Sequence, residues 1–123
     1  MPESGELLVL VVDDEPGIRA TVAEMLSLEG YAVDEAANGA EALAAVERKR
    51  PDLVLLDLRM PVLDGWGFVS ALRSRGLTVP IVVMTAARDT GHWAEAIPAH
   101  GTLAKPFGYD ELMAAVERAR SAA

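Results

Sequence analysis

Short apolar runs separated by amphipathic stretches follow one another along the chain. Residues 7–12, 53–56 and 79–84 read LLVLVV, LVLL and VPIVVM. Such continuous apolar runs are typical of strands that are buried on both faces of a parallel sheet. Residues 31–35 alternate weakly between apolar and polar side chains, as an edge strand does, and a brief strand is expected around Leu103. The pattern therefore predicts five strands.

Helical patterns lie between and after these strands. Pro16 follows three acidic residues and opens the first helical pattern, since proline suits the first turn of a helix. Asn38, with Glu41 three residues later, predicts a helix cap, and Asp64 predicts another. The predicted helices cover residues 16–30, 38–50, 64–76 and 109–120, and a weak helix is expected at 89–97.

Strands that alternate with helices imply a parallel sheet covered on both faces, with right-handed crossovers. We predict an α/β protein with a flavodoxin-like, doubly wound (βα)5 fold and a five-stranded parallel sheet in the order 2-1-3-4-5. In this order the second strand, which ends in Ala36 and Ala37, lies at an edge. A chain of 123 residues suits one domain, so we expect residues 1–123 to form a single domain with its core at about 7–120.

The other four strands each end in polar residues of a different kind. Asp13 and Asp14 follow the first strand, Asp57 the third, Thr85 the fourth and Lys105 the fifth. Side chains at the carboxyl ends of parallel strands meet in one crevice. We therefore expect a cluster of acids, one hydroxyl and one amine, which is a site for a metal and a phosphoryl group.

Each of these residues also has a purely structural interpretation. Asp14 could cap the first helix, Thr85 could be an ordinary β-branched strand residue, and Lys105 could be a solvated loop amine. Asp57 ends an apolar strand, where an unpaired buried carboxylate costs several kcal/mol, so it should be paired or have a raised pKa.

Composition excludes several function classes. The formal net charge of −8 and the absence of a basic stripe disfavour direct binding to nucleic acid. The chain has no cysteine, which excludes disulfides and thiol chemistry and suits a reducing compartment. No apolar run approaches the ~20 residues that span a bilayer. We therefore expect a soluble, cytoplasmic protein that does not bind membranes.

Four motifs in the right order carry a family resemblance: VDDEP at residues 12–16, DLRMPVLDG at 57–65, TA at 85–86 and KPF at 105–107. Together, over residues 7–120, they resemble the receiver domain of bacterial response regulators in two-component systems. The resemblance implies that Asp57 accepts a phosphoryl group from a sensor histidine kinase or phosphotransfer protein, and that Thr85 and Lys105 contact that group. It implies no enzyme activity beyond self-phosphorylation from a phosphodonor and slow self-dephosphorylation.

The acidic cluster predicts a bound cation. Three carboxylates about 4 Å apart repel by about 4 kcal/mol per pair at an effective dielectric of 20, and oxygen ligands without histidine or cysteine favour Mg²⁺. By the resemblance, Asp14 and Asp57 bind the ion directly and Asp13 mostly through water. The backbone carbonyl of Arg59 adds a further ligand.

The chain departs from the family pattern at the residue three before Lys105, which is Thr102 where an aromatic is usual. Pro98 lies within the expected fourth helix, so we expect that helix to be short or broken. These departures keep open a degenerate receiver that works as a phosphorylation-independent interaction module. An aspartate-nucleophile phosphatase of the dehalogenase type is a third hypothesis, disfavoured because Arg59 stands where that class has a second aspartate. The downstream protein and homodimer formation are left open.

Overall fold

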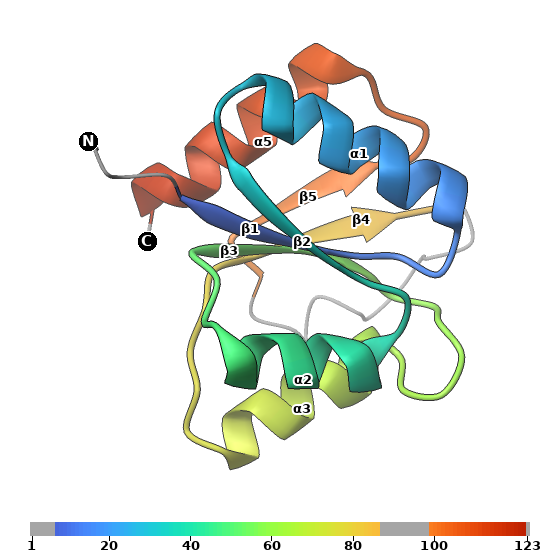
Figure 1. The fold of residues 1–123 in the computed structure, drawn as a ribbon, viewed down its shortest axis with the longest axis vertical. Helices are drawn as coiled ribbons and strands as arrows, with labels where there is room; N and C mark the ends of the chain where they lie inside the picture. The colour runs from blue at the N-terminus through green and yellow to red at the C-terminus, as the bar shows by residue number, and fades with distance from the viewer. Residues whose placement is uncertain (1–6, 87–98, 123) are drawn as a thin grey trace.

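The computed structural model describes residues 7–86 and 99–122. Five parallel strands form one sheet in the order β2-β1-β3-β4-β5, which confirms the predicted order. Helices α1 and α5 cover one face of the sheet, and α2 and α3 cover the other (Figure 1). The strands are β1 (Leu8–Val12), β2 (Ala32–Ala36), β3 (Leu53–Asp57), β4 (Ile81–Thr85) and β5 (Gly101–Ala104). The helices are α1 (Pro16–Leu28), α2 (Gly39–Arg48), α3 (Gly65–Ser74) and α5 (Tyr109–Ala122).

The predicted boundaries differ from these at several ends. The strand expected at residues 79–84 begins only at Ile81, directly after Pro80, which has no N–H group to donate to a neighbouring strand. β3 and β4 each run one residue further than predicted, so Asp57 and Thr85 are the last strand residues. The weak helix expected at 89–97 lies outside the described residues. No helix in the described part of the chain is long and apolar enough to cross a membrane.

Alternating strand residues build a separate core on each face of the sheet. Leu10 and Val54, which pair between β1 and β3, face α2 and α3, whereas Val11 and Leu55 face α1 and α5. The first core takes its helix residues from α2 and α3: Ala42, Ala45, Val46, Phe68, Val69 and Leu72. The second takes them from α1 and α5: Val22, Leu26, Leu112, Ala115, Val116 and Ala119. Because both faces are covered, the central strands must be apolar throughout.

Side chains cap two of the helices as predicted. Asn38 Oδ1 accepts the Glu41 N–H at 2.9 Å at the start of α2, and Asp64 Oδ1 accepts the Gly67 N–H at 2.9 Å at the start of α3. Helix α1 differs, since its N-cap residue is Glu15 and no side chain caps it. The interpretation of Asp14 as the cap of α1 is therefore wrong.

The loop between β3 and α3 is held by contacts through Leu63. The Gly39 N–H donates to Leu63 O at 2.8 Å, and a Cβ at Gly39 would clash with that oxygen. A Cβ at Gly67 would clash with the Leu63 side chain. Two glycines thus allow the starts of α2 and α3 to close around Leu63, which fixes the loop that follows Asp57.

Val62 in the same loop has φ +69° and is 82 % exposed, so replacing it should stabilise the protein. A β-branched residue is strained in the left-handed region, whereas asparagine tolerates it. We expect Val62→Asn to raise the free energy of unfolding by about 1 kcal/mol, measured by urea denaturation. Val62→Ala, which keeps a Cβ at positive φ, should gain less. An unchanged or lower stability of the Val62→Asn variant would contradict the strain.

Candidate functional site

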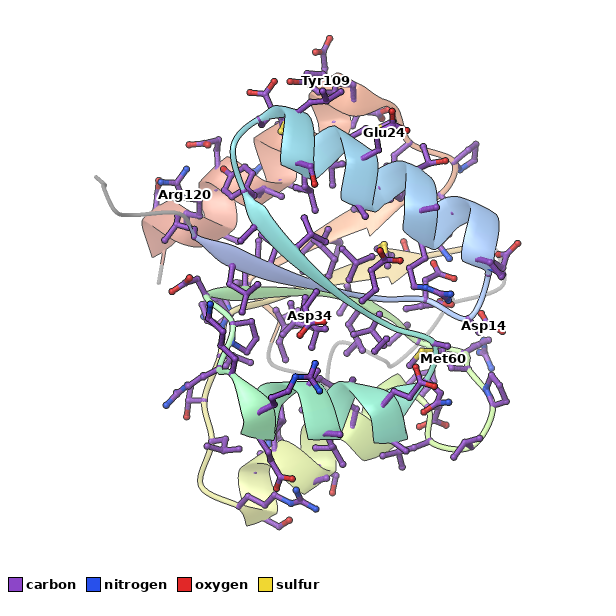
Figure 2. The ribbon with its side chains drawn as sticks, viewed as in Figure 1. Asp14, Glu24, Asp34, Met60, Tyr109 and Arg120 are labelled. Carbon is purple, nitrogen blue, oxygen red and sulfur yellow. The ribbon has the colours of Figure 1, made fainter. Side chains whose placement is uncertain are left out.

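The strand register brings the predicted site residues to one edge of the sheet. Asp57 pairs with Met84, and Thr85 pairs with Ala104, so the ends of β3, β4 and β5 lie level. Asp13 and Lys105 are the first residues after β1 and β5. Figure 2 shows Asp14 at this end of the sheet, the end that also carries Met60 of the β3–α3 loop.

Three carboxylates gather at this edge. Asp13, Asp14 and Asp57 each offer an oxygen, and these oxygens lie within 4.8 Å of one another. Asp13 is fully buried and Asp57 is 5 % exposed, whereas Asp14 is exposed. The arrangement is a cup with two acids in its wall and one at its mouth, and its donor set of carboxylate oxygens fits a hard divalent cation.

Lys105 lies against the two buried acids. Its Nζ is 2.8 Å from Asp13 Oδ2 and 3.6 Å from Asp57 Oδ1, and its side chain is only 14 % exposed. Burial lowers the Lys105 pKa, but the hydrogen bond from Lys105 to Asp13 and the charges of both acids outweigh burial, and the pKa is raised. The amine is therefore charged, and its interpretation as a solvated loop residue is wrong.

Thr85 is half-buried at the end of β4. Its carbonyl oxygen accepts the Lys105 N–H at 2.7 Å, so the backbones of the two residues are joined. The structure thus places the predicted hydroxyl and amine on adjacent strand ends.

The carboxylate of Asp13 is engaged by the protein itself. Oδ1 accepts the Glu15 N–H at 2.9 Å, and Oδ2 accepts from Lys105 at 2.8 Å. Asp14 is exposed at the rim. The two neighbouring aspartates therefore have different environments: Asp13 belongs to the framework of the site, and Asp14 faces outward.

Asp57 has a raised pKa of about 6, compared with an ordinary value of 3.8. Burial is the main cause, and the negative charges of Asp13 and Asp14 act in the same direction. The Lys105 charge and a hydrogen bond from the Arg59 backbone oppose the rise. Asp57 is thus both paired and raised in pKa. Well above pH 6 it is an ionised carboxylate with little solvation, the form in which a carboxylate can act as a nucleophile.

Two further side chains at the site were not predicted in these roles. Arg19 Nη1 donates to Asp13 O at 2.7 Å, and the Arg19 guanidinium is also paired with Glu35 of β2. Arg59 lies over the Trp66 ring at 5.6 Å from its centroid. The sequence shows only a charged residue on a predicted helix and another beside Asp57, and neither partner follows from spacing along the chain.

A cavity of about 820 Å³ lies beside the acidic cup, between α1 and the segment after β5. Lys105, Glu15 and Thr21 are its polar lining residues. The remaining walls are mostly apolar: Pro16, Ile18, Val22, Met25, Pro106 and Phe107. A partner that reaches into the acidic cup therefore has an apolar surface next to it.

The raised pKa of Asp57 makes stability depend on pH. Because the folded pKa exceeds the unfolded one, the stability contributed by protonated Asp57 is lost as the pH rises from 3.8 to about 6. Asp57→Asn should therefore stabilise the protein by up to about 3 kcal/mol at pH 7.5, and by about 1 kcal/mol less at pH 5. Urea denaturation at both pH values measures this, with Glu24→Gln as an exposed control. An equal gain at both pH values would contradict the raised pKa.

The fold and the site define a class: a doubly wound α/β protein with an acidic cup that could hold a cation, a largely buried lysine and a threonine at the carboxyl edge of its sheet. A model of the response regulator receiver domain matches residues 9–117. The chain belongs to this family, which confirms the predicted resemblance and makes it a receiver domain of two-component signalling. The comparisons lend no support to a degenerate receiver.

The relatives are bacterial response regulators and similar proteins. Response regulator MprA of Mycobacterium sp. (strain KMS) is 41 % identical over 108 residues, covering 86 % of this chain and 47 % of the relative. Sporulation initiation phosphotransferase F of Bacillus subtilis (strain 168) is 38 % identical over 112 residues, covering 89 % of this chain and 90 % of the relative. The chain thus spans about half the length of MprA.

Solved structures of response regulators have the same fold as this chain. Chemotaxis response regulator CheY4 of Vibrio cholerae superposes with a TM-score of 0.84 at 35 % identity, covering 94 % of this chain and 99 % of the other. The receiver domain of NtrX from Brucella abortus gives a TM-score of 0.85 at 34 % identity, with the same coverage.

Proposed function

We propose that this chain accepts a phosphoryl group on Asp57 in a Mg²⁺-dependent reaction and acts as a signalling switch in the cytoplasm. The donor is a sensor histidine kinase or a phosphotransfer protein. The observation that carries the proposal is the position of Asp57, a buried carboxylate 3.6 Å from the Lys105 ammonium and within 4.8 Å of two further acids.

The residues of the cup fit Mg²⁺. Asp14 and Asp57 would bind the ion directly, Asp13 through water, and the Arg59 carbonyl would add a ligand. The engagement of both Asp13 oxygens and the exposure of Asp14 support this division. When bound, the ion neutralises charge on the transferring phosphoryl group.

The remaining steps of phosphoryl transfer depend on side chains of the protein itself. An Asp57 oxygen forms a bond to phosphorus while the bond from phosphorus to the donor histidine nitrogen breaks. The Lys105 ammonium stabilises the phosphoryl oxygens, and the Thr85 hydroxyl donates a hydrogen bond to one of them. Attack by water later releases phosphate and restores the carboxylate. Self-phosphorylation and slow self-dephosphorylation are the only reactions in this proposal.

The donor docks on the cavity between α1 and the segment after β5. A donor that presents a phosphorylated histidine to Asp57 would meet this mostly apolar surface, because Lys105 lines the cavity and lies 3.6 Å from Asp57. A downstream protein, or a second copy of this chain, reads the phosphorylated state.

Treatment with acetyl phosphate and Mg²⁺ should add the mass of one phosphoryl group to the wild type, measured on the intact protein. Asp57→Asn should add none, because an amide is not a nucleophile here. Asp52→Asn, a matched change at the opposite end of β3, should react like the wild type. A wild type that gains no mass, or an Asp57→Asn variant that gains as much, would refute the role of Asp57.

Thr21→Arg should separate donor docking from chemistry. Thr21 is exposed and lines the cavity, so a large charged side chain there obstructs a partner without disturbing the core. We expect about tenfold slower transfer from a phosphorylated histidine phosphotransfer protein that serves the wild type. The rate with acetyl phosphate should not change. Leu28→Arg, on the same helix but outside the cavity, is the control. Equal slowing with both donors would contradict docking at this surface.

A further inference from the structure

Arg19 is a cation beside the acidic cup that the proposed chemistry does not use. Its Nη1 donates to the backbone oxygen of Asp13 at 2.7 Å, and its Nε lies 3.3 Å from Glu35 Oε1. We infer that Arg19 is a positioning residue that holds the β1–α1 loop in the geometry that receives Mg²⁺. The inference rests on the proposed function, because it concerns how that site is arranged.

The atom that Arg19 holds determines where Asp14 lies. The Asp13 carbonyl belongs to the peptide group that leads to Asp14. Asp13 is itself anchored, so holding its carbonyl oxygen as well leaves the nitrogen and Cα of Asp14, which lie in the same planar peptide, little freedom. Asp14 is exposed, and the described contacts of its carboxylate do not anchor it. The position of the Asp14 carboxylate therefore depends on the position of the Asp13–Asp14 backbone.

Few other described contacts hold the β1–α1 loop near the Asp13 carbonyl. Helix α1 begins without a side-chain cap, so its first turn does not hold the loop through a side chain. The Asp13 N–H donates to Ala36 O at 3.1 Å and the Glu15 N–H to Asp13 Oδ1 at 2.9 Å. These bonds fix the two ends of the loop. The bond from Arg19 fixes the carbonyl between them.

Arg19 is itself held by two contacts. Its side chain is 20 % exposed, and Glu35 on the edge strand β2 pairs with Nε while Nη1 reaches the Asp13 carbonyl. The planar guanidinium can make both contacts at a fixed angle, which the single ammonium of a lysine cannot do. A role in positioning thus predicts that lysine fails to replace Arg19, whereas a role as nearby positive charge predicts that it succeeds.

The test measures Mg²⁺ binding to the full chain by calorimetry. Arg19→Gln should weaken Mg²⁺ binding about tenfold, the usual cost of losing a residue that orients a ligand. Arg19→Lys should be nearly as weak, and Glu35→Gln should be weakened less because the bond to Asp13 O remains. At saturating Mg²⁺ the rate of phosphorylation by acetyl phosphate should return to that of the wild type. A loss of affinity with an unchanged maximal rate distinguishes positioning from general damage to the fold.

A second measurement needs no metal. Hydrogen exchange of the Glu15 amide, which donates to Asp13 Oδ1, should be faster in Arg19→Gln than in the wild type. The matched control is Arg48→Gln. Arg48 also joins a helix to β2, through Asp34 at 3.0 Å, but it does not contact the β1–α1 loop. Its loss should leave both Mg²⁺ binding and Glu15 exchange unchanged.

Each outcome decides the inference. Arg19→Lys binding Mg²⁺ as the wild type does would show that charge suffices, and Arg19→Gln matching Arg48→Gln would show that Arg19 has no role; either result overturns the inference. If the wild type binds Mg²⁺ and accepts a phosphoryl group while the Arg19 variants behave like it, only this inference fails. A wild type that binds no Mg²⁺ overturns the proposed function and the inference together.

Discussion

The contact between Lys105 and Asp13 is the interaction on which the site depends. It joins the end of β5 to the end of β1, although β3 and β4 lie between them in the sheet. Three carboxylates whose oxygens lie within 4.8 Å of one another repel by roughly 3 to 4 kcal/mol per pair at an effective dielectric of 20. One buried ammonium close to two of them offsets part of that repulsion. The remaining part adds to burial, the main cause, in raising the pKa of Asp57.

Asp13 is the most constrained residue of the cup. Its N–H, its carbonyl and both carboxylate oxygens have partners, from Ala36, Arg19, Glu15 and Lys105. A polar group with all its hydrogen bonds satisfied inside the protein reorganises little. Asp13 is therefore a fixed part of the wall of the cup, and the negative charge that destabilises the ionised cup is the charge that would attract a cation. The clustered negative charge thus lowers the stability of the folded protein at the site where the proposed function requires that charge.

Much of this architecture could be predicted from the sequence, because it depends on local patterns. Apolar runs mark the central strands, the acid, hydroxyl and amine at their ends mark the site, and Asn38 and Asp64 mark two helix starts. Strand order followed from the rule that site residues share a crevice.

The remaining features depend on contacts between segments far apart in the chain. Arg19 pairs with Glu35, which lies on another element, so the pair could not be predicted from the sequence around Arg19. The close contact between Gly39 and the Leu63 oxygen could not be predicted from the sequence around Gly39 for the same reason. Asp14 has the residue type of a cap, yet Asp13 Oδ1 accepts the Glu15 N–H and no side chain caps α1. The positive φ of Val62 is likewise not indicated by its residue type, since a β-branched residue is strained there.

Thr102 bears on how a phosphorylated site communicates with the rest of the molecule. It is exposed on β5, so its side chain cannot fill a buried space behind Thr85 as a large aromatic would. A switch from 1:99 to 99:1 needs about 5.5 kcal/mol of differential stabilisation, and in this chain that difference must arise elsewhere. The Thr85 carbonyl binds the Lys105 N–H at 2.7 Å, and Phe107, two residues further on, packs against the core beneath α1 and α5. Thr85, Lys105 and Phe107 thus form one continuous connection between the acidic cup and the wall of the cavity where we place the donor.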